Sequence, residues 1–82
     1  MGVVKQFILY STSGCHLCEI AHGMIEQALA GRPDHACVEV DIADDDALFG
    51  RYGIRIPVLL HPDGRELGWP FDDAELDAFM SS

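Results

Sequence analysis

The stretch that decides the fold reads STSGCHLC, residues 11–18. It places the thiols of Cys15 and Cys18 three positions apart, after an apolar run and before a helical pattern. Because residues three apart share one face of a helix, the two cysteines can close a disulfide with little rearrangement. Cys15 would lie at the helix N-terminus, where unpaired N–H groups and the helix dipole favour thiolate over thiol. The implied chemistry is thiol–disulfide exchange, with Cys15 as nucleophile and Cys18 as resolving thiol.

Length and composition limit the class of protein. The chain has 82 residues, 49% of them hydrophobic, which predicts one small domain, residues 1–82, with its own core. Its 14 acidic residues against 5 Lys and Arg give a net charge of −9, which argues against nucleic acid or an anionic membrane as partner. The sequence has no secretory-signal pattern, so we expect a cytoplasmic protein. In that compartment a Cys-x-x-Cys motif indicates redox or metal chemistry.

The hydrophobic pattern predicts seven secondary-structure elements. They are strands over residues 3–11, 35–42, 54–61 and 65–68, and helices that begin at Cys15, at the acidic run 44–46 and at Asp72. The order is therefore β-α-β-α-β-β-α. Helical crossovers predict parallel pairing of the first strands, and the short turn at 62–64 predicts an antiparallel hairpin.

Local patterns add detail to two of the helices. The first helix carries an apolar stripe, predicted to be buried, of Leu17, Ile20, Ala21, Met24, Ala28 and Leu29. Asp72 and Glu75 have the spacing of a capping box, with Phe71 and Leu76 placed as a hydrophobic staple.

The second strand alternates in polarity, and its pattern places Cys37 on the more polar face. Cys37 is interpreted as a small strand residue without a role, with a peripheral redox partner or a regulatory thiol as the alternative. Trp69 is interpreted as a cap over the core, with a ligand platform as the alternative.

Two blocks carry a resemblance to known proteins, YSTSGCHLC at residues 10–18 and RYGIRIPVLL at residues 51–60. With the motif between the first strand and first helix, and a proline opening the third strand, the chain resembles the thioredoxin fold, and its first block is similar to that of glutaredoxins. The resemblance implies an α/β domain with a four-stranded mixed sheet and helices on both faces. It also implies a cis bond at Pro57, and backbone groups of Ile56 that face a bound substrate.

The resemblance makes glutathione a candidate partner. Several residues differ from those that glutaredoxins carry, and these differences weigh against glutathione binding. Thr12 stands where glutaredoxins carry a basic residue, and His16-Leu17 replaces their Pro-Tyr pair. Of their Gly-Gly-acid sequence near the last helix, Gly68 and one acid remain. Arg51 and Arg55 are the residues expected to supply positive charge from the opposite wall of the site, and Arg55 is the one counted among the site residues.

The predicted site therefore combines the motif with residues brought in by the resemblance. The predicted catalytic residues are Cys15 and Cys18, and those predicted to bind or tune are His16, Arg55, Ile56, Pro57 and Asp72. A His16 imidazolium would stabilise the Cys15 thiolate; the alternative is a solvent-facing side chain without coupling to the sulfur. No cofactor is required in this interpretation, and no further ligand pair has the spacing of a zinc finger or ribbon.

Two functions from different classes follow. The first is a small monomeric thiol–disulfide oxidoreductase that acts on a protein or low-molecular-weight disulfide and is recycled by an unidentified reductant. The alternative is a non-catalytic thioredoxin-fold module, which would serve in binding or as a metal or iron–sulfur accessory protein. A Cys15 thiolate well below the ordinary thiol range, with turnover that depends on Cys15, distinguishes the first from the second.

Overall fold

A computed structural model describes residues 4–82. The elements in this range are β1 (Lys5–Ser11), α1 (His16–Ala30), β2 (His35–Asp41), a 3₁₀ turn η1 (Ile42–Asp44), α2 (Asp46–Tyr52), β3 (Val58–Leu60), β4 (Glu66–Gly68) and α3 (Asp73–Ser81). Apart from η1, their order is the predicted β-α-β-α-β-β-α. Val3, where the first strand was predicted to begin, lies outside the described residues.

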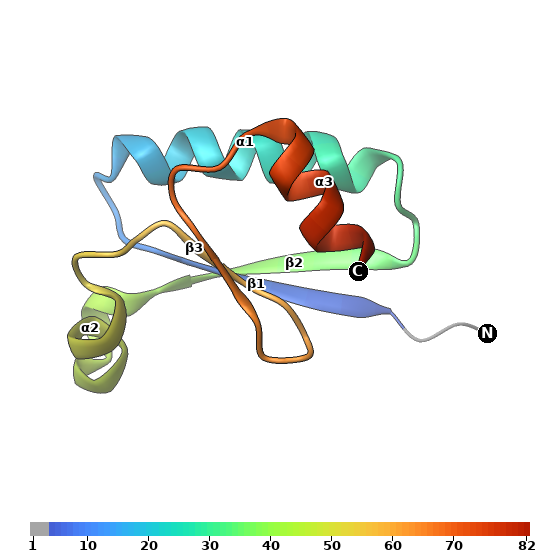
Figure 1. Cartoon of the computed structure of the whole chain (residues 1–82). Coiled ribbons are helices and arrows are strands. Elements are labelled where there is room, and N and C mark those ends of the chain that lie inside the picture. Colours follow the sequence, from blue (N-terminus) through green and yellow to red (C-terminus); the bar gives the residue numbers. More distant parts are fainter. Residues whose placement is uncertain (1–3) are drawn as a thin grey trace.

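The sheet is mixed, in the order β2-β1-β3-β4. β1 runs parallel to β2 and antiparallel to β3, and β4 returns antiparallel to β3. Helices α1 and α3 lie on one face of the sheet and α2 on the other (Figure 1). The predicted four-stranded mixed sheet with helices on both faces is confirmed.

The central strand β1 divides its apolar side chains between the two faces, because successive strand residues point to opposite sides. Phe7 and Leu9 are fully buried under α1 and α3. The other residues of that cluster are Ala21, Ile25, Leu59, Phe71, Leu76 and Met80. On the opposite face, Tyr10 packs in a second cluster with Ile42, Tyr52 and Val58. Each face therefore has its own core.

The third strand is shorter than predicted, since β3 begins only at Val58. The backbone N–H groups of Arg55 and Ile56 both donate to the carbonyl of Tyr52, at 2.8 and 3.0 Å. Pro57 has no N–H to give. The predicted start of this strand is therefore a turn that follows α2, because its donors are already used.

Two burial predictions were wrong. Leu17 and Ile20 are 45% and 42% exposed, and the buried residues of α1 are Cys18, Ala21 and Ile25. Cys37 is half-buried against the core beneath α1 and α3, not on a polar face. On the edge strand β2 both faces are only partly covered, so alternation of polarity did not identify the packed side.

The last helix begins as predicted. The Asp72 carboxylate accepts from the Glu75 N–H at 2.7 Å, and the Glu75 carboxylate accepts from the Asp72 N–H at 3.2 Å. Phe71 and Leu76, the predicted staple, are both buried in the larger core. The capping box thus fixes where α3 starts over the sheet.

Candidate active site

Cys15 and Cys18 lie at the N-terminus of α1 and form a disulfide. Cys15 is the N-cap, and its Sγ accepts a hydrogen bond from the Cys18 N–H at 3.1 Å. Gly14, at φ +78°, allows the chain to turn sharply into this position, since glycine adopts positive φ without a steric penalty. The predicted placement of Cys15 at a helix N-terminus is confirmed.

The two cysteines of the disulfide differ in their exposure to solvent. Cys18 is 2% exposed and lies on the buried face of α1, whereas Cys15 is half-buried. An incoming group from solvent therefore meets Cys15 first. This asymmetry follows from helix geometry, because the N-cap stands outside the first turn and the residue three positions later turns towards the sheet.

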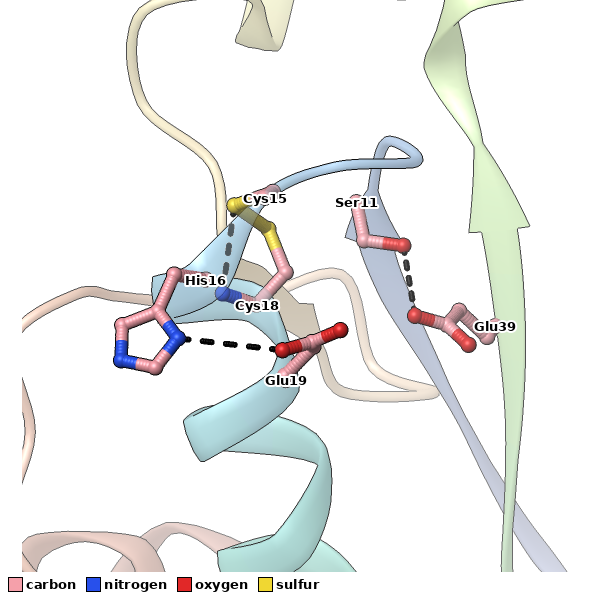
Figure 2. Close-up of a disulfide and its surroundings, with 6 residues drawn as sticks. All are labelled: Ser11, Cys15, His16, Cys18, Glu19 and Glu39. Atoms are coloured by element: carbon pink, nitrogen blue, oxygen red, sulfur yellow. Dashed lines mark hydrogen bonds and ion pairs between the residues drawn. A yellow bond between two sulfur atoms is a disulfide. The ribbon is translucent and has the colours of Figure 1, made fainter.

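His16 projects from the first turn into solvent, with its side chain 81% exposed. Its Nδ1 lies 3.8 Å from Oε2 of Glu19, one turn along the helix (Figure 2). The carboxylate of Glu19 partly offsets the charge of a His16 imidazolium. Any stabilisation of a Cys15 thiolate by His16 is correspondingly weakened, and the backbone N–H of Cys18 is the positive group in direct contact with the sulfur.

Strand pairing brings Pro57 to the same end of the sheet as the disulfide. Tyr10 pairs with Val58, so Pro57 stands next to Ser11, where the loop to Cys15 begins. The bond between Ile56 and Pro57 is cis, and the carbonyl of Pro57 accepts from the Trp69 N–H at 3.2 Å. Because the N–H of Ile56 is donated to Tyr52, a substrate backbone would have to use the Ile56 carbonyl or displace that bond.

A polar depression that sequence reasoning missed adjoins the disulfide loop. It has a volume of about 260 Å³ and is lined by Ser11, Thr12, Ser13, Glu39 and Asp41. Ser11 is buried, and its hydroxyl donates to Oε2 of Glu39 at 2.7 Å. In Figure 2, Ser11 and Cys15 stand at the two ends of the loop that joins β1 to α1. The available signal was topological, because the carboxyl ends of adjacent parallel strands meet at one edge of a sheet.

The family follows from the comparisons with known proteins. A family model described as "Glutaredoxin-like domain (DUF836)" matches residues 6–81. The chain belongs to this family. No curated protein matches it significantly.

Solved structures of similar chains share the fold. The X-ray structure of a protein from X. campestris, a structural-genomics target called XcR50, is similar at 45% identity and a TM-score of 0.78, with 92% of this chain and 95% of that one covered. Protein Ne2328 from Nitrosomonas europaea shares 22% identity with a TM-score of 0.77, over 96% and 94% of the two chains. Thioredoxin O2 from Arabidopsis thaliana, in its oxidized state, shares 22% identity with a TM-score of 0.70, over 98% and 75%. The last two show the thioredoxin-like fold alone.

Two predicted site residues of the glutaredoxin-like domain have structural contacts elsewhere. Arg55 pairs with Glu66 at 2.8 Å and lies over the ring of Tyr52, whose hydroxyl donates to the same carboxylate at 2.6 Å. These contacts tie α2 to β4, and they lower the pKa of Glu66, first through the Tyr52 hydroxyl and then through Arg55. Asp72 caps α3. Within residues 4–82, no hydrogen bond or ion pair joins either residue to the cysteines.

The third cysteine differs electrostatically from the pair. Burial raises the pKa of the Cys37 thiol to about 11, so this thiol is neutral at physiological pH. In the described part of the chain, no three His, Cys, Asp or Glu side chains gather to hold a metal ion. None of the helices described there is long and apolar enough to span a membrane.

Proposed function

We propose that this glutaredoxin-like domain is a thiol–disulfide oxidoreductase in which Cys15 attacks and Cys18 resolves, acting on a protein or low-molecular-weight disulfide. The observation that carries the proposal is the Cys15–Cys18 disulfide at the start of α1, with Cys15 accessible and Cys18 buried. Membership of a glutaredoxin-like family, together with this chain's own Cys-x-x-Cys pair on a thioredoxin-like fold, supports redox chemistry in general.

The reaction balances as a two-electron exchange. The Cys15 thiolate attacks one sulfur of the substrate disulfide, forms a mixed disulfide and releases the other substrate sulfur as a thiolate. The Cys18 thiolate then attacks the Cys15 sulfur and releases the second substrate thiolate. The two protons of the original dithiol end on the substrate thiols, and the domain is left oxidised. A dithiol or low-molecular-weight thiol returns it to the reduced form.

The site contributes three effects to these steps. The Cys18 N–H and the α1 N-terminus favour the Cys15 thiolate as nucleophile and as leaving group. The buried Cys18 holds the resolving sulfur at short range, since the Cα atoms of the pair are 5.2 Å apart. The carbonyl of Ile56, beside Pro57, offers a position at which a substrate backbone docks. We further propose that the domain works in the cytoplasm as a monomer without a bound cofactor, and that glutathione is at most one of several exchanging thiols.

A redox titration against glutathione buffers tests the proposal. The fraction of Cys15–Cys18 disulfide, read by mass spectrometry after acid quenching, gives the reduction potential and shows whether glutathione exchanges. Cys15→Ser is expected to abolish reduction of a test disulfide, and Cys18→Ser to accumulate the mixed disulfide on Cys15. Cys37→Ser is the matched control, because it removes a thiol without touching the pair. Ordinary thiol pKa values at both positions and no reduction of any test disulfide would instead favour the non-catalytic module.

A further inference from the structure

The surface on the α1 side of the disulfide is apolar and uncovered. Leu17, which lies between the cysteines in sequence, and Ile20 are 45% and 42% exposed. Further along α1, Met24 and Ala28 are half-buried and line a groove with Leu76 of α3. Figure 1 shows α3 beside the half of α1 that is distant from the disulfide. The same flank of the helix is therefore covered at one end and open at the end that carries the sulfurs.

A further exposed apolar residue lies in the segment that leads to Pro57. Ile54 is fully exposed, two positions before Ile56, in the turn that leads into β3. Large apolar side chains are normally exposed singly, and a set of them around a reactive group indicates a contact surface. Here Leu17 and Ile20 belong to the segment that carries the sulfurs, and Ile54 belongs to the segment that leads to Pro57, which stands next to Ser11.

The charge around the same sulfurs is negative. Glu19, in the first turn of α1, is 78% exposed, and the depression on the other side of the loop carries the carboxylates of Glu39 and Asp41. Residues 11–20 contain one basic residue, His16, and it faces Glu19. Arg55, the cation expected on the opposite wall, is paired with Glu66. A disulfide that approaches Cys15 thus meets apolar side chains and carboxylates that form no ion pair with a Lys or Arg of residues 4–82.

We propose that the substrate is a polypeptide disulfide whose cysteine is flanked by apolar residues and by Lys or Arg, and that the basic residue enters the depression beside Glu39 and Asp41. The apolar neighbours of that cysteine contact Leu17 and Ile20. This inference rests on the proposed oxidoreductase function and names its substrate class. Oxidised glutathione is an anion, so a chain with a net charge of −9 repels it, whereas the same charge attracts a basic peptide.

Single-turnover oxidation of the reduced full chain by three matched peptide disulfides tests the proposal. The probes are the symmetric disulfides of acetylated and amidated Lys-Leu-Cys-Leu-Lys, Gln-Leu-Cys-Leu-Gln and Glu-Leu-Cys-Leu-Glu, with oxidised glutathione as a fourth. The domain is reduced with dithiothreitol and desalted, so no other reductant is present. Formation of the Cys15–Cys18 disulfide is followed by mass spectrometry after acid quenching.

The expected order of rates is basic, then neutral, then acidic, with oxidised glutathione close to the acidic peptide. Steering by surface charge predicts a basic-to-acidic ratio of about tenfold or more at low ionic strength. The ratio should fall to about twofold near 0.5 M salt, where exposed charges are screened within roughly 4 Å. Equal rates for the basic and acidic peptides, or a faster reaction with oxidised glutathione, would overturn the proposal.

Variants locate the effect on this surface. Glu39→Gln and Asp41→Asn retain the acceptor oxygens used by Ser11 and by η1, and together they should slow the basic peptide about threefold without slowing the neutral one. Asp46→Asn removes one charge from α2, on the opposite face of the sheet, and serves as the control.

The apolar part of the surface has its own pair of variants. Leu17→Gln with Ile20→Gln should slow all three peptides, whereas Phe49→Gln, which alters a 57% exposed residue of α2, should not. If the control variants slowed the peptides as much as the site variants do, the proposal would also be overturned. If no probe oxidises the pair at all, both this inference and the oxidoreductase function fail; if all probes react alike, only this inference fails.

Discussion

Replacing Asp72 separates a helix-capping role from a substrate role for the same carboxylate. In Asp72→Ala the Glu75 N–H loses its 2.7 Å acceptor, and the first turn of α3 loses a negative charge. Loss of an N-cap costs about 1 kcal/mol, within a range of roughly 0.5–2. For a domain of this size that corresponds to a decrease in Tm of about 4–8 °C. Asp72→Asn keeps an acceptor oxygen in place. Its loss of stability should therefore be limited to the interaction of the negative charge with the helix dipole, about 0.3–1 kcal/mol.

The measurement is urea unfolding of the oxidised protein, with Tm as a second readout. Asp73→Ala is the matched control, because it removes a carboxylate from the same turn without removing the cap. A fall in Tm that is equal in Asp72→Asn and Asp72→Ala would refute the capping argument, since the acceptor would then be irrelevant. A slower reaction of folded, reduced Asp72→Asn with the peptide probes would assign to this carboxylate the substrate contact that the glutaredoxin resemblance implies.

Three further predictions concern titratable groups. His16→Ala should raise the pH midpoint of Cys15 alkylation by less than about one unit, because the imidazole is exposed and faces a carboxylate; an unchanged midpoint would remove His16 from the site. The Tyr52 hydroxyl and the Arg55 guanidinium lower the pKa of Glu66 from 4.5. The stability that the Glu66 carboxylate contributes is therefore present above pH 4.5 and is lost as the pH falls below that value. Glu66→Gln should therefore unfold at a lower urea concentration than the parent at neutral pH, and this difference should shrink as the pH falls below 4.5. With its pKa near 11 instead of 9.0, Cys37 should be alkylated about 100-fold more slowly than an exposed cysteine at pH 8, and fast labelling of the native oxidised protein would contradict this.

Much of the fold was predictable because its signals are local. A Cys-x-x-Cys after an apolar run and before a helical pattern marks one strand–helix junction, and the spacing of Asp72 and Glu75 marks the start of the last helix. Each of these signals is contained in one continuous stretch of sequence. The structure therefore places Cys15 as an N-cap and begins α3 at Asp73, as the sequence indicated.

What could not be predicted depends on contacts between distant segments. Cys37 was expected on a polar face, but its burial depends on α1 lying over that side of β2. Leu17 fits the apolar period of its helix, and it stays exposed because α3 packs only further along α1. Ser11 and Glu39 are 28 positions apart in sequence, and their hydrogen bond forms because β1 and β2 lie side by side. No pattern within a single element contains that information.

The site combines electrostatic effects of opposite sign that act over different distances. Each Lys and Arg in the described part of the chain has a partner: Lys5 the Ser82 carbonyl, Arg32 the carboxylate of Asp77, Arg51 the ring of Tyr52, Arg55 the carboxylate of Glu66, and Arg65 the carboxylate of Asp63. At the sulfur the favourable potential is supplied by the Cys18 N–H and the helix terminus, whose influence falls off within about one turn. The surrounding carboxylates act over a Debye length, about 8 Å at physiological salt. Thiolate formation at Cys15 and the choice of partner by charge are therefore separable: added salt should weaken selection between cationic and anionic disulfides and leave the hydrogen bond at Cys15 intact.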